Sequence, residues 1–163
     1  MPTPRNYEQV AAQMTAEGDK PARMQRVVDA LWTELRGKGC SWIGFYTAAS
    51  GGTELVLAAR RDKPACSPIG LHGACGRAFQ SRRALVVTDV KHLGDGYIAC
   101  DPRDRSEAVL PCFDPESGEC WGVLDADSHD AGAWSARDVL GLSEVLHRAG
   151  LGRPLRSDEI DTV

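Results

Sequence analysis

The sequence lacks the features that mark several large classes of protein. It contains no run of 18 apolar residues, so we expect no membrane-spanning helix. Lys and Arg total 19 against 23 Asp and Glu, and the sequence pI is about 5.5, so the basic surface of a nucleic-acid-binding protein is not indicated. The first ten residues are polar and hold no apolar signal segment. We therefore expect a cytoplasmic protein that binds neither nucleic acid nor membrane.

The six cysteines also lack the spacing of a zinc site. Structural zinc sites usually show C-x2-4-C pairs, and the loop cysteines have no such close partner and no H-x3-5-H pair. We therefore expect no metal. In a reducing compartment such cysteines are more typical of catalysis or of a protein core than of a disulfide framework. Accessible cysteines without metal spacing indicate thiol–disulfide chemistry, in which one thiol attacks and another resolves.

Length and periodicity predict one α+β domain. A chain of 163 residues is typical of a single domain, here with a core over residues 6–149 and a frayed polar tail over 153–163. Asp19 is a predicted N-cap for an amphipathic helix that ends near Gly37. Predicted helices also span 6–14, 73–81 and the segment after Ser135, and predicted strands span 41–49, 54–61, 84–88, 107–113 and 120–126. Two hairpins with helices at both ends of the sequence favour an antiparallel sheet with helices on one face.

One cysteine lies in a long polar segment between the predicted strand 84–88 and the second hairpin. Cys100 stands in G-D-G-Y-I-A-C-D-P-R-D-R-S-E-A-V-L-P, residues 94–111, beside Arg103 and Arg105. A partly exposed thiol near cations forms the nucleophilic thiolate more readily, and a long loop inside a compact domain is usually functional. The alternative is a loop cysteine without a role.

The other cysteines divide into two groups. Cys66 lies in a predicted loop, and Cys75 lies in the first turn of a predicted helix, where the helix dipole favours a thiolate. Cys40 directly precedes the first predicted strand, and Cys112 and Cys120 lie within strand patterns. All three are expected in the core.

Three carboxylates are predicted to converge on one hairpin. Asp125 and Asp127 leave the same face of a strand, and Glu107 lies on the partner strand. Such a cluster is unfavourable unless one acid is protonated or a cation lies among them, so it suits an ammonium-bearing ligand or a step that needs a proton donor. The alternative is a pair of solvated acids at a strand end.

Two aromatic residues share a face of the first strand. Trp42 and Tyr46 belong either to the core or to the wall of a small pocket. The four histidines have no motif partner, and we assign them no role.

Taken in order, six short motifs resemble the free methionine-(R)-sulfoxide reductases, which are built on a GAF domain. The motifs are W-I-G-F-Y at 42–46, P-A-C at 64–66, G-A-C-G at 73–76, G-Y-I-A-C-D at 96–101, S-E-A-V-L-P at 106–111 and G-V-L-D-A-D-S at 122–128. The resemblance covers residues 7–146 and implies an antiparallel sheet with helices on one face and a ligand pocket on the other. It also implies reduction of free L-methionine-(R)-sulfoxide without a bound cofactor, recycling by thioredoxin, and a homodimer.

The same resemblance implies a role for each matching residue. Cys100 attacks the sulfoxide sulfur and becomes a sulfenic acid, Cys66 resolves it as a disulfide, and Cys75 is a second candidate resolver. The acidic cluster binds the ammonium and assists protonation of the sulfoxide oxygen, with Glu107 and Asp127 favoured at the oxygen. The matching substrate-binding residues are Trp42, near the substrate methyl, Tyr46, Glu107, Asp125 and Asp127.

Two departures from the family pattern fall in one loop. Residues 67–74 are one residue shorter than usual, and Arg60-Arg61-Asp62 replaces F-Q-G. Two other functions stay open, a non-catalytic GAF module that senses a ligand or redox state and a partner-binding domain. A sensor has no need of an acidic cluster and a cysteine set that both match the enzymes.

Overall fold

The computed structural model describes residues 3–94, 97 and 100–163. The helices are α1 (Tyr7–Ala12), α2 (Lys20–Leu35), α3 (Ala74–Ser81) and α4 (Ala136–Arg148), with 3-10 turns η1 (Val90–Leu93) and η2 (Ser157–Glu159). The strands are β1 (Trp42–Ala48), β2 (Leu55–Arg61), β3 (Ala84–Val87), β4 (Ser106–Phe113), β5 (Cys120–Ser128) and β6 (Ile160–Thr162). They form one sheet in the order β2-β1-β5-β4-β3-β6. The predicted α+β class is confirmed.

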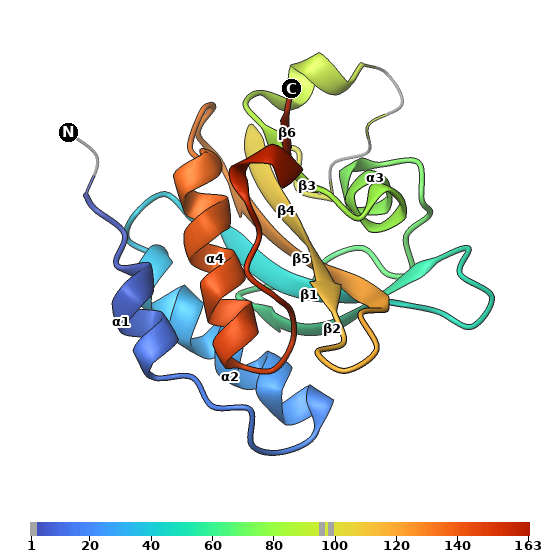
Figure 1. The fold of residues 1–163 in the computed structure, drawn as a ribbon. Helices are drawn as coiled ribbons and strands as arrows, with labels where there is room; N and C mark the ends of the chain where they lie inside the picture. Colours follow the sequence, from blue (N-terminus) through green and yellow to red (C-terminus); the bar gives the residue numbers. More distant parts are fainter. Residues whose placement is uncertain (1–2, 95–96, 98–99) are drawn as a thin grey trace.

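The two faces of the sheet carry two separate clusters of buried side chains. Helices α2 and α4 cover one face, and α1 packs against them on the same side of the sheet (Figure 1). The core on this face includes Leu31 of α2, Phe45 of β1 and Leu142 of α4. Each such fully buried side chain contributes about 1.5–3 kcal/mol to folding. The other face carries a second cluster that includes Trp42 and Tyr46. Successive side chains of β1 point to opposite faces, so Phe45 lies in the helix-covered core while Trp42 and Tyr46 lie on the other face, as the sequence pattern predicted.

Local signals in the sequence account for the helix ends. The Asp19 carboxylate accepts a hydrogen bond from the backbone N–H of Ala22 at 2.9 Å and begins α2. The backbone N–H of Ser135 donates to Asp138 at 2.9 Å in a capping box that begins α4. Asp138 also accepts from the Tyr7 hydroxyl at 2.7 Å, which joins α4 to α1.

One helix lies on the face opposite the other three. Helix α3 packs against β4 and β5 on the pocket side, where Ala74 and Ala78 are buried (Figure 1). The predicted placement of the helices on one face is therefore correct for three of the four. Among the described residues, no helix combines the length and the apolar character that crossing a bilayer requires.

The prediction of a frayed tail is wrong. Residues 160–162 form β6, which pairs in parallel with β3, and the backbone N–H of Val163 donates to Val86 at 2.9 Å. Arg83 binds the Asp161 carboxylate at 3.1 Å across this pair. The edge of β3 offers unpaired backbone groups, so even a polar segment is stabilised there once the chain returns to it.

Gly122 of β5 allows β5 to lie close to its neighbour β1 in the sheet. A Cβ added to Gly122 would lie 2.2 Å from the carbonyl oxygen of Tyr46, and its neighbours there are backbone atoms of β1 that cannot rotate away. We expect Gly122→Ala to lower the free energy of unfolding by about 2–4 kcal/mol, measured by urea denaturation. The matched control is Gly37→Ala, where an added Cβ meets nothing within 4 Å. Equal stability of the two variants would contradict this account.

Candidate functional site

The register of the three central strands brings the predicted acids together. Glu107 of β4 lies opposite Asp127 of β5, and Asp127 lies in turn opposite Trp42 of β1. Asp125 lies opposite Gly44, two residues along both strands. Because residues two apart in a strand share a face, all of these side chains lie on the pocket face of the sheet.

The three carboxyl groups are buried in close proximity. Glu107, Asp125 and Asp127 are 5%, 7% and 9% exposed, and each offers an oxygen within 4.8 Å of the others. Burial raises the pKa of Asp125 to about 7. Burial and repulsion by Asp125 raise the pKa of Glu107 and of Asp127 well above their ordinary values. The cluster therefore binds protons at a pH where solvated acids have lost them.

Part of this cluster is unsatisfied within the protein. Among the described residues, one buried oxygen of Asp125 and one of Asp127 have no hydrogen-bond partner. Glu107 accepts a hydrogen bond from the Tyr97 hydroxyl at 3.0 Å. Buried polar atoms without partners are uncommon, and here they face a cavity, which is the arrangement expected where a ligand supplies the missing donors.

Trp42 and Tyr46 of β1 form one wall of the site and also bind the backbone of the loop that carries Cys66. Their ring centroids lie 6.2 Å apart, and both side chains are buried. The indole N–H of Trp42 donates to the carbonyl of Lys63, and the hydroxyl of Tyr46 donates to the carbonyl of Cys66, each at 2.8 Å. Gly44 lies between them, and its missing side chain leaves the space that the Trp42 ring occupies.

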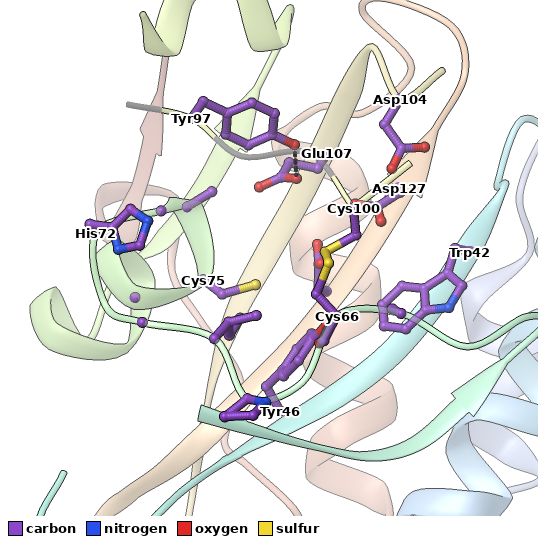
Figure 2. A pocket seen from close by; sticks show the side chains of 18 residues that line it. Trp42, Tyr46, Cys66, His72, Cys75, Tyr97, Cys100, Asp104, Glu107 and Asp127 are labelled. Atoms are coloured by element: carbon purple, nitrogen blue, oxygen red, sulfur yellow. Dashed lines mark hydrogen bonds between the residues drawn. A yellow bond between two sulfur atoms is a disulfide. The ribbon is translucent and has the colours of Figure 1, made fainter. Parts of the chain in front are cut away.

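Two of the three loop cysteines are joined. Cys66 and Cys100 form a disulfide with Cα atoms 5.7 Å apart, and both residues are exposed. Figure 2 shows this bond beside Trp42, with Glu107 and Asp127 in the same cavity. An exposed disulfide is accessible to an external thiol.

Cys75 differs from its prediction. It lies in the first turn of α3, but it is 7% exposed and close to the acidic cluster. Burial and then the negative charges of Asp125 and Glu107 raise the pKa of this thiol well above its ordinary value. The expected thiolate is therefore wrong, because burial among acids outweighs the dipole of a short helix. Cys40, Cys112 and Cys120 are free and buried, as predicted.

These elements enclose a cavity of about 290 Å³. Its polar side lies at the ends of β4 and β5, and its apolar side lies against β1, α3 and the loop 65–73. Lining residues include Trp42, Tyr46, Cys66, Ile69, His72, Cys75, Tyr97, Cys100, Asp104, Glu107, Asp125 and Asp127 (Figure 2). The structure thus brings every predicted site residue to one small cavity.

Three polar residues that line the cavity were not predicted from the sequence. Tyr97 stands three residues before Cys100 in the motif at 96–101, and that proximity was its only signal. Asp104, which is 7% exposed, and His72 also line the cavity, and neither had a motif partner. Of the motif at 96–101, Gly96, Ile98 and Ala99 lie outside the described residues, as does Asp95 before it.

Within the part of the chain that the structure describes, two groups of side chains have the composition of a cation site. One is the carboxyl cluster inside the cavity, and the other is Asp101, Asp104 and His129 at its edge. In the second group, Lys63 and Arg103 already pair with Asp101. In the first group a single ammonium ion would relieve the repulsion among the carboxyls.

Comparison with known proteins agrees with this geometry. The GAF domain model matches residues 22–152. The free methionine-R-sulfoxide reductase of Escherichia coli is 37% identical over 108 residues, 65% of this chain and 62% of that protein. The structure of fRMsr of Staphylococcus aureus in its reduced form superposes with a TM-score of 0.80 at 31% identity, covering 92% of this chain and 96% of that one.

A second solved structure was determined with its substrate bound. The free methionine-R-sulfoxide reductase of Neisseria meningitidis superposes with a TM-score of 0.74 at 34% identity, covering 88% of this chain and 81% of that one. The chain therefore belongs to the GAF domain family and, within it, to the free methionine-R-sulfoxide reductases.

Proposed function

We propose that this protein reduces free L-methionine-(R)-sulfoxide to L-methionine. One observation carries the proposal, namely that an exposed disulfide between Cys66 and Cys100 lies at a cavity that contains three buried carboxyl groups. The disulfide supports redox chemistry at this position, and the acids supply the proton that sulfoxide reduction requires. Family membership supports the same activity.

The cavity suits a small zwitterion with a polar and an apolar end. A volume of about 290 Å³ is at the lower end of small-molecule sites, which fits a single amino acid better than a residue inside a protein. The ammonium group of the ligand binds the acidic cluster, with Asp125 as its principal partner. Trp42 and Tyr46 enclose the S-methyl end, with Trp42 at the methyl group.

In the first step the Cys100 thiolate attacks the sulfoxide sulfur. The sulfoxide oxygen is a poor leaving group until it is protonated, so Glu107 and Asp127 supply a proton to it. The attack forms a bond between the Cys100 sulfur and the substrate sulfur. This bond and the substrate sulfur–oxygen bond then break as the protonated oxygen is transferred to the Cys100 sulfur, so that methionine leaves and Cys100 becomes a sulfenic acid. The substrate sulfur gains two electrons and the Cys100 sulfur loses two.

In the second step a thiol replaces the sulfenic hydroxyl. Cys66 attacks the Cys100 sulfur, water leaves, and a disulfide forms. The bond between Cys66 and Cys100 supports Cys66 in this role, whereas the buried Cys75 is disfavoured because its thiol holds its proton tightly. The exposed disulfide is then reduced by thioredoxin, which restores both thiols.

The nucleophile can be tested directly. Replacing Cys100 by Ser removes the only sulfur that performs the first step in this scheme, so we expect methionine release from the free R sulfoxide to fall by about 10³-fold or more. Methionine is quantified by chromatography with thioredoxin, thioredoxin reductase and NADPH as the reducing system. The S epimer and a peptide-bound sulfoxide serve as substrate controls and should not turn over.

The opposite result has a clear meaning. If well-folded wild-type protein released no methionine from any sulfoxide, the reductase proposal would be wrong. A GAF module that senses a ligand or the redox state through the same disulfide would then explain the site.

The resolving cysteine can be separated from the nucleophile by counting turnovers. With thioredoxin as the only reductant, Cys66→Ser should release about one methionine per protein molecule and then stop, because the sulfenic acid is not converted to a disulfide. Cys75→Ser is the matched control and should turn over continuously. Continuous turnover by Cys66→Ser together with arrest of Cys75→Ser would reverse the assignment.

Proton binding by the cluster predicts how stability depends on pH. Asp125 loses its proton near pH 4 when unfolded but at about pH 7 when folded. The folded state therefore binds more protons in this window, so the contribution of the cluster is fully present below about pH 4 and is lost as the pH rises through about 7.

The test compares urea denaturation of wild type and Asp125→Asn across that window. From about pH 4 to 7 the wild-type free energy of unfolding should decline more than that of the variant by about 1–3 kcal/mol. Glu116→Gln removes an exposed acid in the 114–119 turn and should follow the wild type. Parallel curves for wild type and Asp125→Asn would show that Asp125 holds no extra proton in the folded state.

A further inference from the structure

Besides the disulfide, an ion pair joins the same two chain segments. Lys63 stands three residues before Cys66, and its ammonium contacts the carboxylate of Asp101, which directly follows Cys100. The pair therefore bridges residues 38 positions apart in the sequence, on the loop of one cysteine and the loop of the other. The catalytic scheme above assigns it no task.

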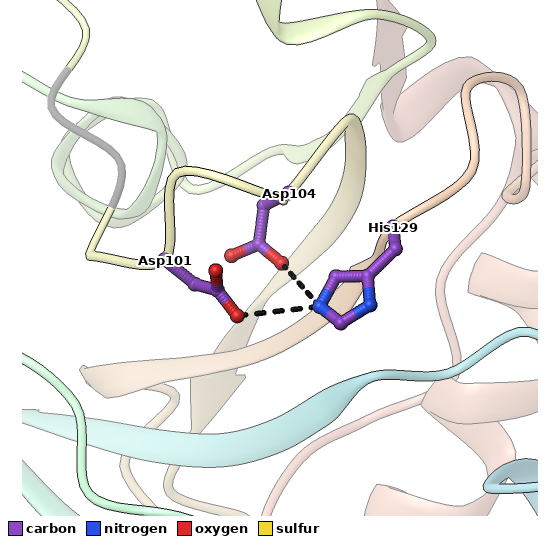
Figure 3. A group of neighbouring side chains, drawn as sticks. All are labelled: Asp101, Asp104 and His129. Atoms are coloured by element: carbon purple, nitrogen blue, oxygen red, sulfur yellow. Dashed lines mark hydrogen bonds and ion pairs between the residues drawn. The ribbon is translucent and has the colours of Figure 1, made fainter.

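Asp101 is well placed to act as a fixed anchor. Its side chain is 12% exposed and accepts hydrogen bonds from Arg103 at 3.0 Å. The imidazole of His129, just beyond β5, lies 3.2 Å from Asp101 and 3.7 Å from Asp104, which attaches this segment to the end of the sheet (Figure 3). Hydrogen bonds from Arg103 and Lys63 hold the pKa of Asp101 well below its usual range, so the carboxylate is ionised.

The Lys63 side of the bridge is also anchored. The carbonyl of Lys63 accepts the hydrogen bond from the Trp42 indole, and the carbonyl of Cys66 accepts that from the Tyr46 hydroxyl. The Lys63 side chain is 39% exposed and crosses from this loop to Asp101. Both ends of the ion pair are thus tied to the sheet by interactions other than the disulfide.

We propose that Lys63 is a positioning residue, whose ion pair with Asp101 keeps the Cys66 loop beside Cys100 when the disulfide is open. The ion pair raises the effective concentration of the Cys66 thiol at Cys100. By linkage, the factor by which the disulfide favours the ion pair equals the factor by which the ion pair favours the disulfide. Its place in the catalytic cycle rests on the proposed function, but its effect on disulfide formation does not.

The ion pair would protect the sulfenic acid on Cys100, which is a reactive intermediate. A sulfenic acid without an adjacent thiol is open to further oxidation to sulfinic acid, which ordinary thiols do not reverse. Holding Cys66 close shortens the lifetime of the sulfenic acid. The ion pair acts before the covalent bond exists, when the two loops would otherwise be free to separate.

A different role for Lys63 would be to stabilise the Cys100 thiolate through its charge. Arg103 separates the two ideas, because it pairs with the same Asp101 carboxylate but belongs to the Cys100 segment. Among the described residues it makes no ion pair or hydrogen bond with another segment. Removing either cation takes one positive charge from this region. Only removal of Lys63 disconnects the loops.

The first test is redox equilibrium with glutathione. Glutathione disulfide oxidises the reduced protein to the Cys66–Cys100 disulfide and yields two molecules of glutathione, and the oxidised fraction is measured by mass after alkylation. Lys63→Met should lower the equilibrium constant about three- to fivefold, the upper part of the range expected from one partly exposed ion pair. Lys63→Arg, which keeps the charge, and Arg103→Met should stay within about twofold of wild type.

The second test separates the two chemical steps in a single turnover of reduced protein. For Lys63→Met, methionine release should match wild type within about twofold, while disulfide formation is slower by a factor similar to the loss in equilibrium constant. A sulfenic-acid trap such as dimedone should label Cys100 more heavily in this variant. Lys63→Arg should restore both the rate and the low labelling.

Several outcomes would overturn the proposal. An unchanged equilibrium constant for Lys63→Met, an equal loss in Arg103→Met, or a loss confined to methionine release would each show that Lys63 does not position the loop. If the wild type releases no methionine, the proposed function fails. The glutathione measurement still decides whether Lys63 positions Cys66.

Discussion

The register of β1 against β5 and of β5 against β4 is the constraint on which the site depends. It sets Trp42 opposite Asp127, and Asp127 opposite Glu107. A slip of one residue in β5 would move its two acids into the core beneath α2 and α4, where Leu124 and Ala126 now lie. The apolar residues of the helix face therefore hold the acids on the opposite face, and packing on one side of the sheet positions the chemistry on the other.

Burying the three carboxyl groups side by side is energetically unfavourable, and the proposed function depends on this. Three buried carboxyls repel one another, and the folded protein reduces the repulsion by binding protons. In the proposed reaction, the ammonium group of the ligand reduces it further, and the sulfoxide oxygen accepts a proton that the cluster already holds. Under that proposal the cluster supplies both binding energy and acid, and it gains both properties from the same burial.

Much of the fold was predictable because periodicity reports burial on two faces. The alternation along β1 separated Phe45 from Trp42 correctly, and the signals at Asp19 and Ser135 located two helix starts. The tail escaped prediction because β6 is stabilised by pairing with the distant strand β3, which no local pattern records. The environment of Cys75 escaped for a related reason, since a position at a helix start does not reveal which acids another strand brings against it.

The contacts of the aromatic wall show why the cavity and the disulfide loop behave as one unit. Trp42 and Tyr46 line the cavity with their rings and hold the backbone of the Cys66 loop with their polar atoms. We therefore expect a ligand that shifts either ring to move the carbonyl of Lys63 or of Cys66 as well. If the ion pair of Lys63 with Asp101 persists when the disulfide opens, as proposed above, the loop stays attached to the segment that carries Cys100 while the Cys66 thiol moves.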